Sequence, residues 1–136
     1  MSEAAKKSRP QYSNIHITQL VNYRLPLSGL VSILHRISGF LMFLLLPFVL
    51  YLLERSITSE ISFDYLRGFA SHWFVKLITL ALVWAFLHHF CAGIRHLFMD
   101  VHVAIEKDSA RKTATSVLVV SVVLTALVAL KLFGVF

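Results

Sequence analysis

The stretch LITLALVWAFLHHFCAGI, from Leu77 to Ile94, contains no lysine, arginine, aspartate or glutamate. It belongs to an apolar segment at about 76–99, and two similar segments lie at about 30–53 and 113–136. As α-helices these segments would each be about 36 Å long, which is enough to cross a bilayer core of about 30 Å. The sequence therefore predicts an all-α integral membrane protein, a three-helix bundle formed by one domain over residues 1–136.

The composition agrees with this fold class. Hydrophobic residues make up 57% of the 136 residues and charged residues 15%, and the mean hydropathy is +0.74. The one cysteine, Cys91, excludes an internal disulfide and a zinc site built from several thiolates. The net charge of +6 could indicate nucleic-acid binding, but the basic residues flank the apolar segments. We therefore interpret the positive charge as a signal of membrane topology, and we expect no nucleic-acid partner.

The connecting segments predict the orientation in the membrane. The head, residues 1–29, holds four basic residues against Glu3, and the connection at 100–112 holds Lys107, Arg111 and Lys112. The connection at 54–68 holds more acidic than basic residues. Since basic loops remain in the cytoplasm, we expect the N-terminus inside and the C-terminus outside. The start of the sequence is too polar for a signal peptide, so we expect a multi-pass protein of a bacterial cytoplasmic (inner) membrane.

Two polar stripes interrupt the apolar segments. On the first helix, Ser32, His35, Arg36 and Gly39 stand at i, i+3, i+4 and i+7, which places them on one face. On the second, His89, Gly93 and His96 stand at i, i+4 and i+7, while His88 points about 100° away from His89. The predicted topology brings both stripes to the cytoplasmic side, and the two glycines allow close approach of a backbone or a flat ligand.

The chemistry of these stripes suits a haem. His89 lies about 15 Å along the helix from Met99, near mid-bilayer, and a neutral imidazole there can be an axial ligand of haem iron. Arg36, His35 and Arg95 lie nearer the cytoplasmic surface, where they could meet the anionic propionates. Because His35 belongs to a shallower layer and His88 to another face, we expect a partner chain to supply the second axial ligand.

Simpler interpretations stay open on the residues alone. A histidine inside a membrane can serve only as a hydrogen-bond partner for a neighbouring helix. Arg36 and Arg95 can act as interface residues whose charged ends reach the lipid headgroups. The pattern by itself therefore indicates a small three-helix membrane protein and does not decide whether it binds haem.

Longer motifs carry a resemblance to a known family. The stretches RP (Arg9–Pro10), SILHRISG (Ser32–Gly39) and HFCAGIRHLFMD (His89–Asp100) closely resemble the cytochrome b membrane-anchor subunit of succinate dehydrogenase, respiratory Complex II. The likeness covers nearly the whole chain, including the three spans and the basic head. It departs at Gln11, where the family tends to be apolar, and at His102, where a small residue is usual.

The resemblance implies roles for individual residues. His89 would be the haem iron ligand, with the second ligand from the other anchor subunit. Ser32, Arg36 and Asp100 would belong to the quinone site. The surroundings of the haem would include four residues: His35, Arg36, Gly93 and His96. No catalytic residue is expected in this chain, and His88 receives no role.

The resemblance also implies a complex that transfers electrons from succinate to ubiquinone. A flavoprotein, an iron–sulfur protein and a second membrane anchor would be the partners, with haem b, ubiquinone and membrane lipid bound. The chain would be a non-flavin subunit of this oxidoreductase without activity of its own. The alternatives are a haem-free structural anchor of the fumarate reductase type and a small transporter that binds an anion at Arg36 and Arg95. The transporter is disfavoured because the chain has no internal repeat.

Overall fold

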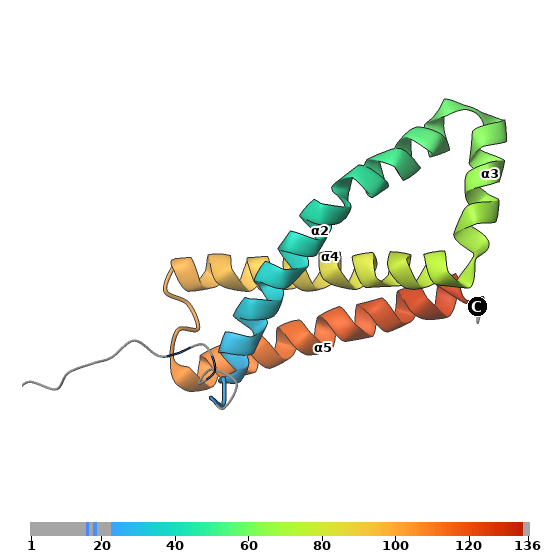
Figure 1. The fold of residues 1–136 in the computed structure, drawn as a ribbon. Coiled ribbons are helices and arrows are strands. Elements are labelled where there is room, and N and C mark those ends of the chain that lie inside the picture. The colour runs from blue at the N-terminus through green and yellow to red at the C-terminus, as the bar shows by residue number, and fades with distance from the viewer. Residues whose placement is uncertain (1–15, 17, 19–22, 135–136) are drawn as a thin grey trace, which may run out of the picture.

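The computed structural model describes residue 16, residue 18 and residues 23–134, so most of the predicted head and the last two residues of the third predicted span lie outside it. The described residues form four α-helices and no strand (Figure 1). The helices are α2 (Leu27–Thr58), α3 (Glu60–Ser71), α4 (Trp73–Asp100) and α5 (Lys107–Leu132).

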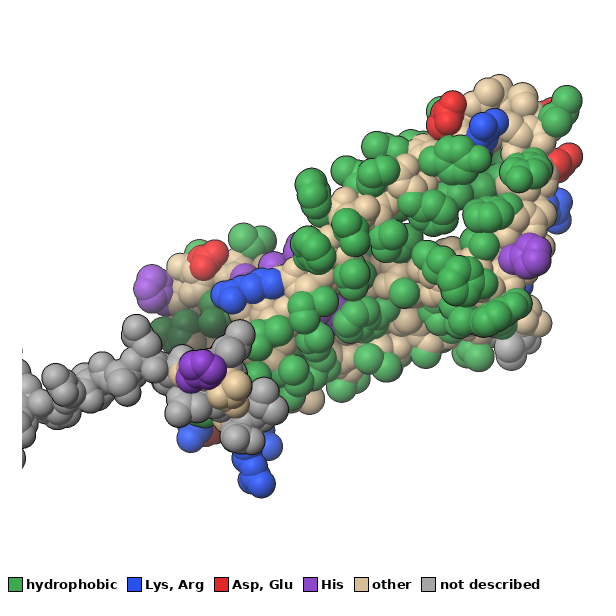
Figure 2. Space-filling view, viewed as in Figure 1, with side chains coloured by type: hydrophobic (Ala, Val, Ile, Leu, Met, Phe, Trp, Pro, Cys, Tyr) green, Lys and Arg blue, Asp and Glu red, His purple; other side chains and the backbone are tan. Residues whose placement is uncertain are grey.

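Three of these helices, α2, α4 and α5, are long and apolar enough to cross a membrane. This confirms the predicted all-α class with three spans. Pro47 lies inside α2, and the helix continues through it without a break. Figure 2 shows hydrophobic side chains covering the middle of the molecule, with most charged side chains toward its two ends. Such a distribution suits a lipid environment, where the outer surface of each span is itself apolar.

The helices pack most closely near one end of the molecule. The helices α4 and α5 lie side by side and antiparallel, and α2 crosses them near the end of α4 and the start of α5 (Figure 1). Beyond the crossing, α2 diverges from α4. The crossing is held by a small buried cluster that consists of Val31, Ala92, Ala114 and Val117. Because alanine is small, the backbones can approach closely here, as is common between membrane helices.

The helix α3 occupies the connection that the sequence left without structure at 54–68. A capping box begins it, in which the Ser59 hydroxyl accepts from the Ser62 backbone N–H and the Ser62 hydroxyl accepts from that of Ser59, each at 3.1 Å. These bonds satisfy backbone donors at the helix start. The helix then runs across the end of the molecule from α2 to α4 (Figure 1).

The turn after α4 holds His102 in a left-handed backbone conformation. His102 has a φ of 61°, its N–H donates to the Met99 carbonyl at 2.9 Å, and the Val103 N–H donates to the Phe98 carbonyl at 2.9 Å. This is a Schellman motif, whose left-handed residue is usually glycine. Histidine at this position pays the steric cost of a Cβ in the left-handed region, which glycine would not.

Candidate functional site

The two polar stripes meet where α2 crosses α4. The Nδ1 atom of His89 lies 3.0 Å from the His35 carbonyl oxygen of α2. Since a carbonyl can only accept, Nδ1 must carry the proton and donate. The Ser38 hydroxyl donates to the same carbonyl at 2.9 Å and lies 3.4 Å from Nδ1. The hydrogen bond thus fixes the tautomer and orientation of His89, and it leaves the lone pair on Nε2.

Gly39 makes this contact possible. A Cβ at Gly39 would lie 2.8 Å from Cε1 and 3.2 Å from Nδ1 of His89, closer than a side chain can normally approach. Gly93 has a looser environment, because a Cβ there would meet only His35 Nε2 at 3.7 Å, an ordinary contact. The ring of His89 therefore needs a glycine on α2, whereas the predicted site residue Gly93 lies beside His35.

Three histidines form a cluster at the crossing. The rings of His35 and His89 are stacked with centroids 4.0 Å apart and planes 17° apart. The ring of His96 lies 5.0 Å from that of His35 at 47°. We expected His35 and His89 in separate layers, and this was wrong: where α2 crosses α4, the two rings are in direct stacking contact.

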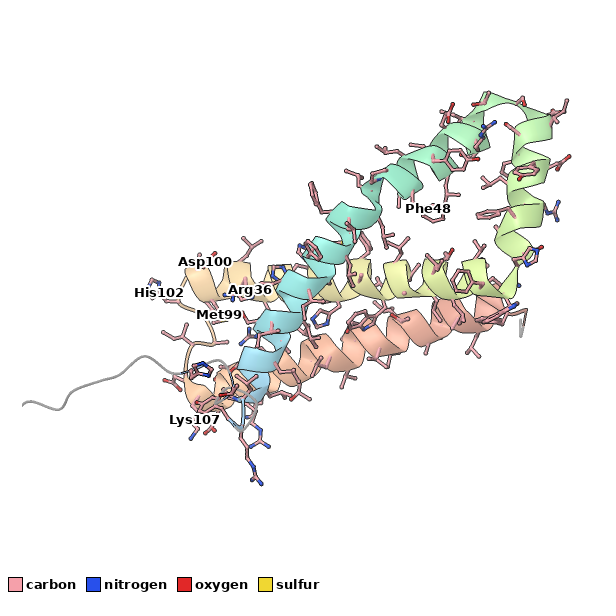
Figure 3. All side chains as sticks on the ribbon, viewed as in Figure 1. Arg36, Phe48, Met99, Asp100, His102 and Lys107 are labelled. Carbon is pink, nitrogen blue, oxygen red and sulfur yellow. The ribbon has the colours of Figure 1, made fainter. Side chains whose placement is uncertain are left out.

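The predicted quinone-site residues lie toward the same end of the molecule as this cluster. Figure 3 shows Arg36 on α2 where it meets α4, and Asp100 at the end of α4. Both side chains are exposed, and neither makes an ion pair or hydrogen bond within the described part of the chain. Ser32, one turn before Arg36, is half-buried, and its hydroxyl is likewise without a bond there. These polar groups remain available to a ligand or a partner.

Arg95 lies on a different side of α4. Its side chain is 5% exposed and packs against α5, where Nε donates to the Thr113 hydroxyl at 3.1 Å and a terminal nitrogen to the Ala110 carbonyl at 3.4 Å. The expectation that Arg95 points to the cytoplasmic edge beside the haem is therefore wrong. Its partners are neutral oxygens, and the arginine links α4 to the start of α5.

His88 fills the interior of the bundle. It is fully buried, stacks on Trp84 at 5.4 Å, and has Nδ1 3.5 Å from the Ser121 hydroxyl of α5. Its Nε2 makes no hydrogen bond of standard geometry among the described residues, although the ring interacts with the Val31 backbone. His88 and His89 thus face different neighbours, as the helical wheel predicts.

The arrangement provides one oriented imidazole rather than a complete metal site. No group of three or more histidine, cysteine or acidic residues that could hold a metal ion occurs in the described residues. His89 offers a single nitrogen with a fixed tautomer, held by a backbone carbonyl in the way that metal-binding histidines commonly are. Such a group can supply one axial ligand to a metal centre whose other ligands come from elsewhere.

Comparison with known proteins gives one family. Residues 7–128 match the model of the succinate dehydrogenase/fumarate reductase transmembrane subunit family. The chain is 40% identical to the succinate dehydrogenase cytochrome b556 subunit of Coxiella burnetii over 104 residues, covering 75% of this chain and 82% of the relative. It is 29% identical to the subunit of the same name from Paracoccus denitrificans over 133 residues, or 98% of both chains. These matches confirm the resemblance carried by the motifs.

The buried arginine generates a test of the packing between α4 and α5. In Thr113→Val the Arg95 Nε loses its acceptor, so the free energy of unfolding should fall by roughly 1–3 kcal/mol. Thermal denaturation of the complex purified in mild detergent measures this. The control is Thr115→Val, whose exposed hydroxyl bonds only to Arg111 of its own helix at 3.0 Å. Equal stability of the two variants would contradict the linking role of Arg95.

Proposed function

Because the chain belongs to the family of succinate dehydrogenase/fumarate reductase transmembrane subunits, we propose that it is the membrane-anchor cytochrome b subunit of a succinate:ubiquinone oxidoreductase. In this role it binds haem b and helps to form the quinone site that takes electrons from the iron–sulfur subunit. The observation that carries the proposal is the hydrogen bond that orients His89 and leaves its Nε2 free.

The haem assignment follows from the donor set. His89 would hold the iron through Nε2, since Nδ1 is engaged by the His35 carbonyl at 3.0 Å. Within the described residues, neither of the two nearest imidazoles lies opposite that nitrogen: His35 stacks on the face of His89, and His88 is buried toward α5. We therefore assign the second axial ligand to the partner anchor subunit. When bound, haem b supplies a centre that exchanges single electrons.

The groups around His89 suit a flat dianionic ligand. Arg36 is exposed and free of ion pairs within the described residues, so its guanidinium can bind a propionate by charge-assisted hydrogen bonds. His35 and His96 extend the polar surface, and Gly93 adds no side chain beside them. We propose these four residues as the haem surroundings.

The quinone site would share Arg36. Reduction of a quinone needs two electrons and two protons and places negative charge on its carbonyl oxygens. The Ser32 hydroxyl can donate a hydrogen bond to one such oxygen, and Arg36, one helical turn further, can stabilise the charge as it develops. Asp100, at the same end of the molecule, can exchange protons with water (Figure 3). The iron–sulfur subunit would complete the pocket from outside the membrane.

The protein is a multi-pass protein of the bacterial inner membrane, as its three apolar helices and bacterial relatives indicate. We propose that the end formed by the histidine cluster, Asp100 and the α4–α5 connection faces the cytoplasm, because that connection and the start of α5 carry Lys107, Arg111 and Lys112. The flavoprotein and iron–sulfur subunits would bind at this end, and the second anchor subunit would pack along the spans.

The haem assignment is tested by an absorption spectrum. The complex with His89→Ala should lose the b-type band of its reduced-minus-oxidised spectrum, measured per flavin, because the iron loses an axial ligand. The matched variant His88→Ala should keep the band, since His88 faces Ser121. A band retained in His89→Ala would exclude this ligand. A native complex without any b-type band would favour a haem-free structural anchor instead.

A second prediction concerns Gly39. In Gly39→Ala the new methyl group would lie 2.8 Å from His89 Cε1, so the imidazole must move. Because the imidazole is the proposed ligand, the haem band should shift or weaken, and the midpoint potential should change. Gly68→Ala is the control, since nothing lies within 4 Å of the added carbon there. An unchanged spectrum and potential in Gly39→Ala would argue against the contact between Gly39 and a ligating His89.

A third prediction separates quinone chemistry from succinate oxidation. In Arg36→Ala the rate of quinone reduction should fall by roughly 10²-fold, as is typical when a group that stabilises developing charge is removed. Succinate oxidation with a soluble dye acceptor should largely survive. Arg67→Ala, an exposed arginine of α3 at the other end of the molecule, should leave both rates unchanged. Equal loss of both rates in Arg36→Ala would indicate a role in assembly.

A further inference from the structure

We infer that α3 is an interfacial membrane helix, which lies flat at the membrane surface opposite the histidine cluster and inserts its Ile61–Tyr65 face among the lipids. This inference does not depend on haem or quinone binding. It concerns the helix that bridges the separated ends of α2 and α4 (Figure 1).

The helix has two chemically distinct sides. One arc carries Ile61, Tyr65 and Phe69 at i, i+4 and i+8, and the broad apolar side also includes Phe63 and Leu66. The opposite arc carries the charged and hydroxyl side chains, namely Glu60, Asp64, Arg67 and Ser71. A strongly amphipathic helix of this kind lies in the interface with its apolar side toward the acyl chains.

Packing inside the chain uses only part of the apolar side. Leu66, Phe69 and one side of Tyr65 line a small pocket with Tyr51 and Arg55 of α2, so this part of the arc faces the protein. Ile61 is 84% exposed and Tyr65 71% exposed. Two large apolar side chains this open to their surroundings need a covering, and the described chain does not provide one.

The position of α3 identifies lipid as the covering. The helix runs across the end of α4 rather than along it, so spans that cross the bilayer would hold α3 in the membrane plane (Figure 1). Directly after α3, Trp73 and Phe74 are 67% and 60% exposed. In the same region the Lys76 ammonium lies 5.6 Å from the centre of the Phe133 ring. Exposed aromatic residues and a lysine at the end of a span mark the membrane–water interface.

The charges of α3 indicate which interaction would keep this helix at the membrane surface. Its polar arc carries two acidic residues, Glu60 and Asp64, and one basic residue, Arg67. Attraction to anionic headgroups therefore contributes little, and burial of Ile61 and Tyr65 in the acyl boundary supplies the free energy of insertion. The partner of this face is the lipid interface itself.

Cysteine accessibility in the assembled complex tests the inference. In a Cys91→Ala background, Ile61→Cys and Asp64→Cys are compared by labelling with a membrane-impermeant maleimide, on intact cells and on inside-out vesicles, and detected as a mass shift of this chain. Both positions are exposed, so neither substitution opens a cavity. On whichever side of the membrane α3 faces, Asp64→Cys should be labelled at least about ten times faster than Ile61→Cys, since maleimide reacts only with thiolates in water. Equal labelling would overturn the inference.

A photoreactive residue distinguishes lipid from a protein covering. With p-benzoylphenylalanine at position 61, illumination of native membranes should give phospholipid adducts of this chain, visible by mass spectrometry. The same residue at position 64 should give few such adducts and is the matched control. A cross-link from position 61 to another protein, in place of the lipid adducts, would overturn the assignment of lipid as the partner.

Discussion

The hydrogen bond between His89 and the His35 carbonyl is the contact on which the site depends. In a bilayer no water replaces a missing partner, so each polar group must find one within the protein or its complex. The His35 carbonyl satisfies two donors, the His89 ring and the Ser38 hydroxyl, while remaining part of α2. One backbone oxygen therefore determines the tautomer of a histidine on another helix, and with it the nitrogen available to a ligand.

This contact requires the two helices to approach closely, and small residues permit that. Gly39 provides the space for the imidazole, and Ala92 lies fully buried one turn along α4 from His89. Between membrane helices there is little hydrophobic gain from association, so close packing and hydrogen bonds hold them. The polar site thus also contributes to the crossing that forms it. Beyond the crossing, α2 carries no glycine, alanine, serine or threonine from Phe40 to Arg55, and it diverges from α4 (Figure 1).

The spans and the meeting of the two stripes could be predicted from the sequence, because apolar length and helical periodicity determine them. The stacking of His35 on His89 could not, since a helical wheel gives direction without the crossing angle. Arg95 was misplaced for a related reason: its position near a span end indicated the surface, but Thr113 of α5 offers an acceptor that only the packing reveals. The helix α3 was not predicted, because only the charge of the connection at 54–68 was considered, although the spacing of its apolar residues is amphipathic.

The adjacent histidines illustrate how one helix serves two interfaces. Consecutive residues of an α-helix point about 100° apart, so His88 reaches Ser121 of α5 while His89 reaches His35 of α2. If only one of these faces carried a polar residue, α4 would form a side-chain hydrogen bond at this level with either α2 or α5, but not with both. The pair instead joins all three spans within a single helical turn. The order of the two residues matters, because only the second faces Gly39, where an imidazole can lie against the backbone with its Nε2 unbound.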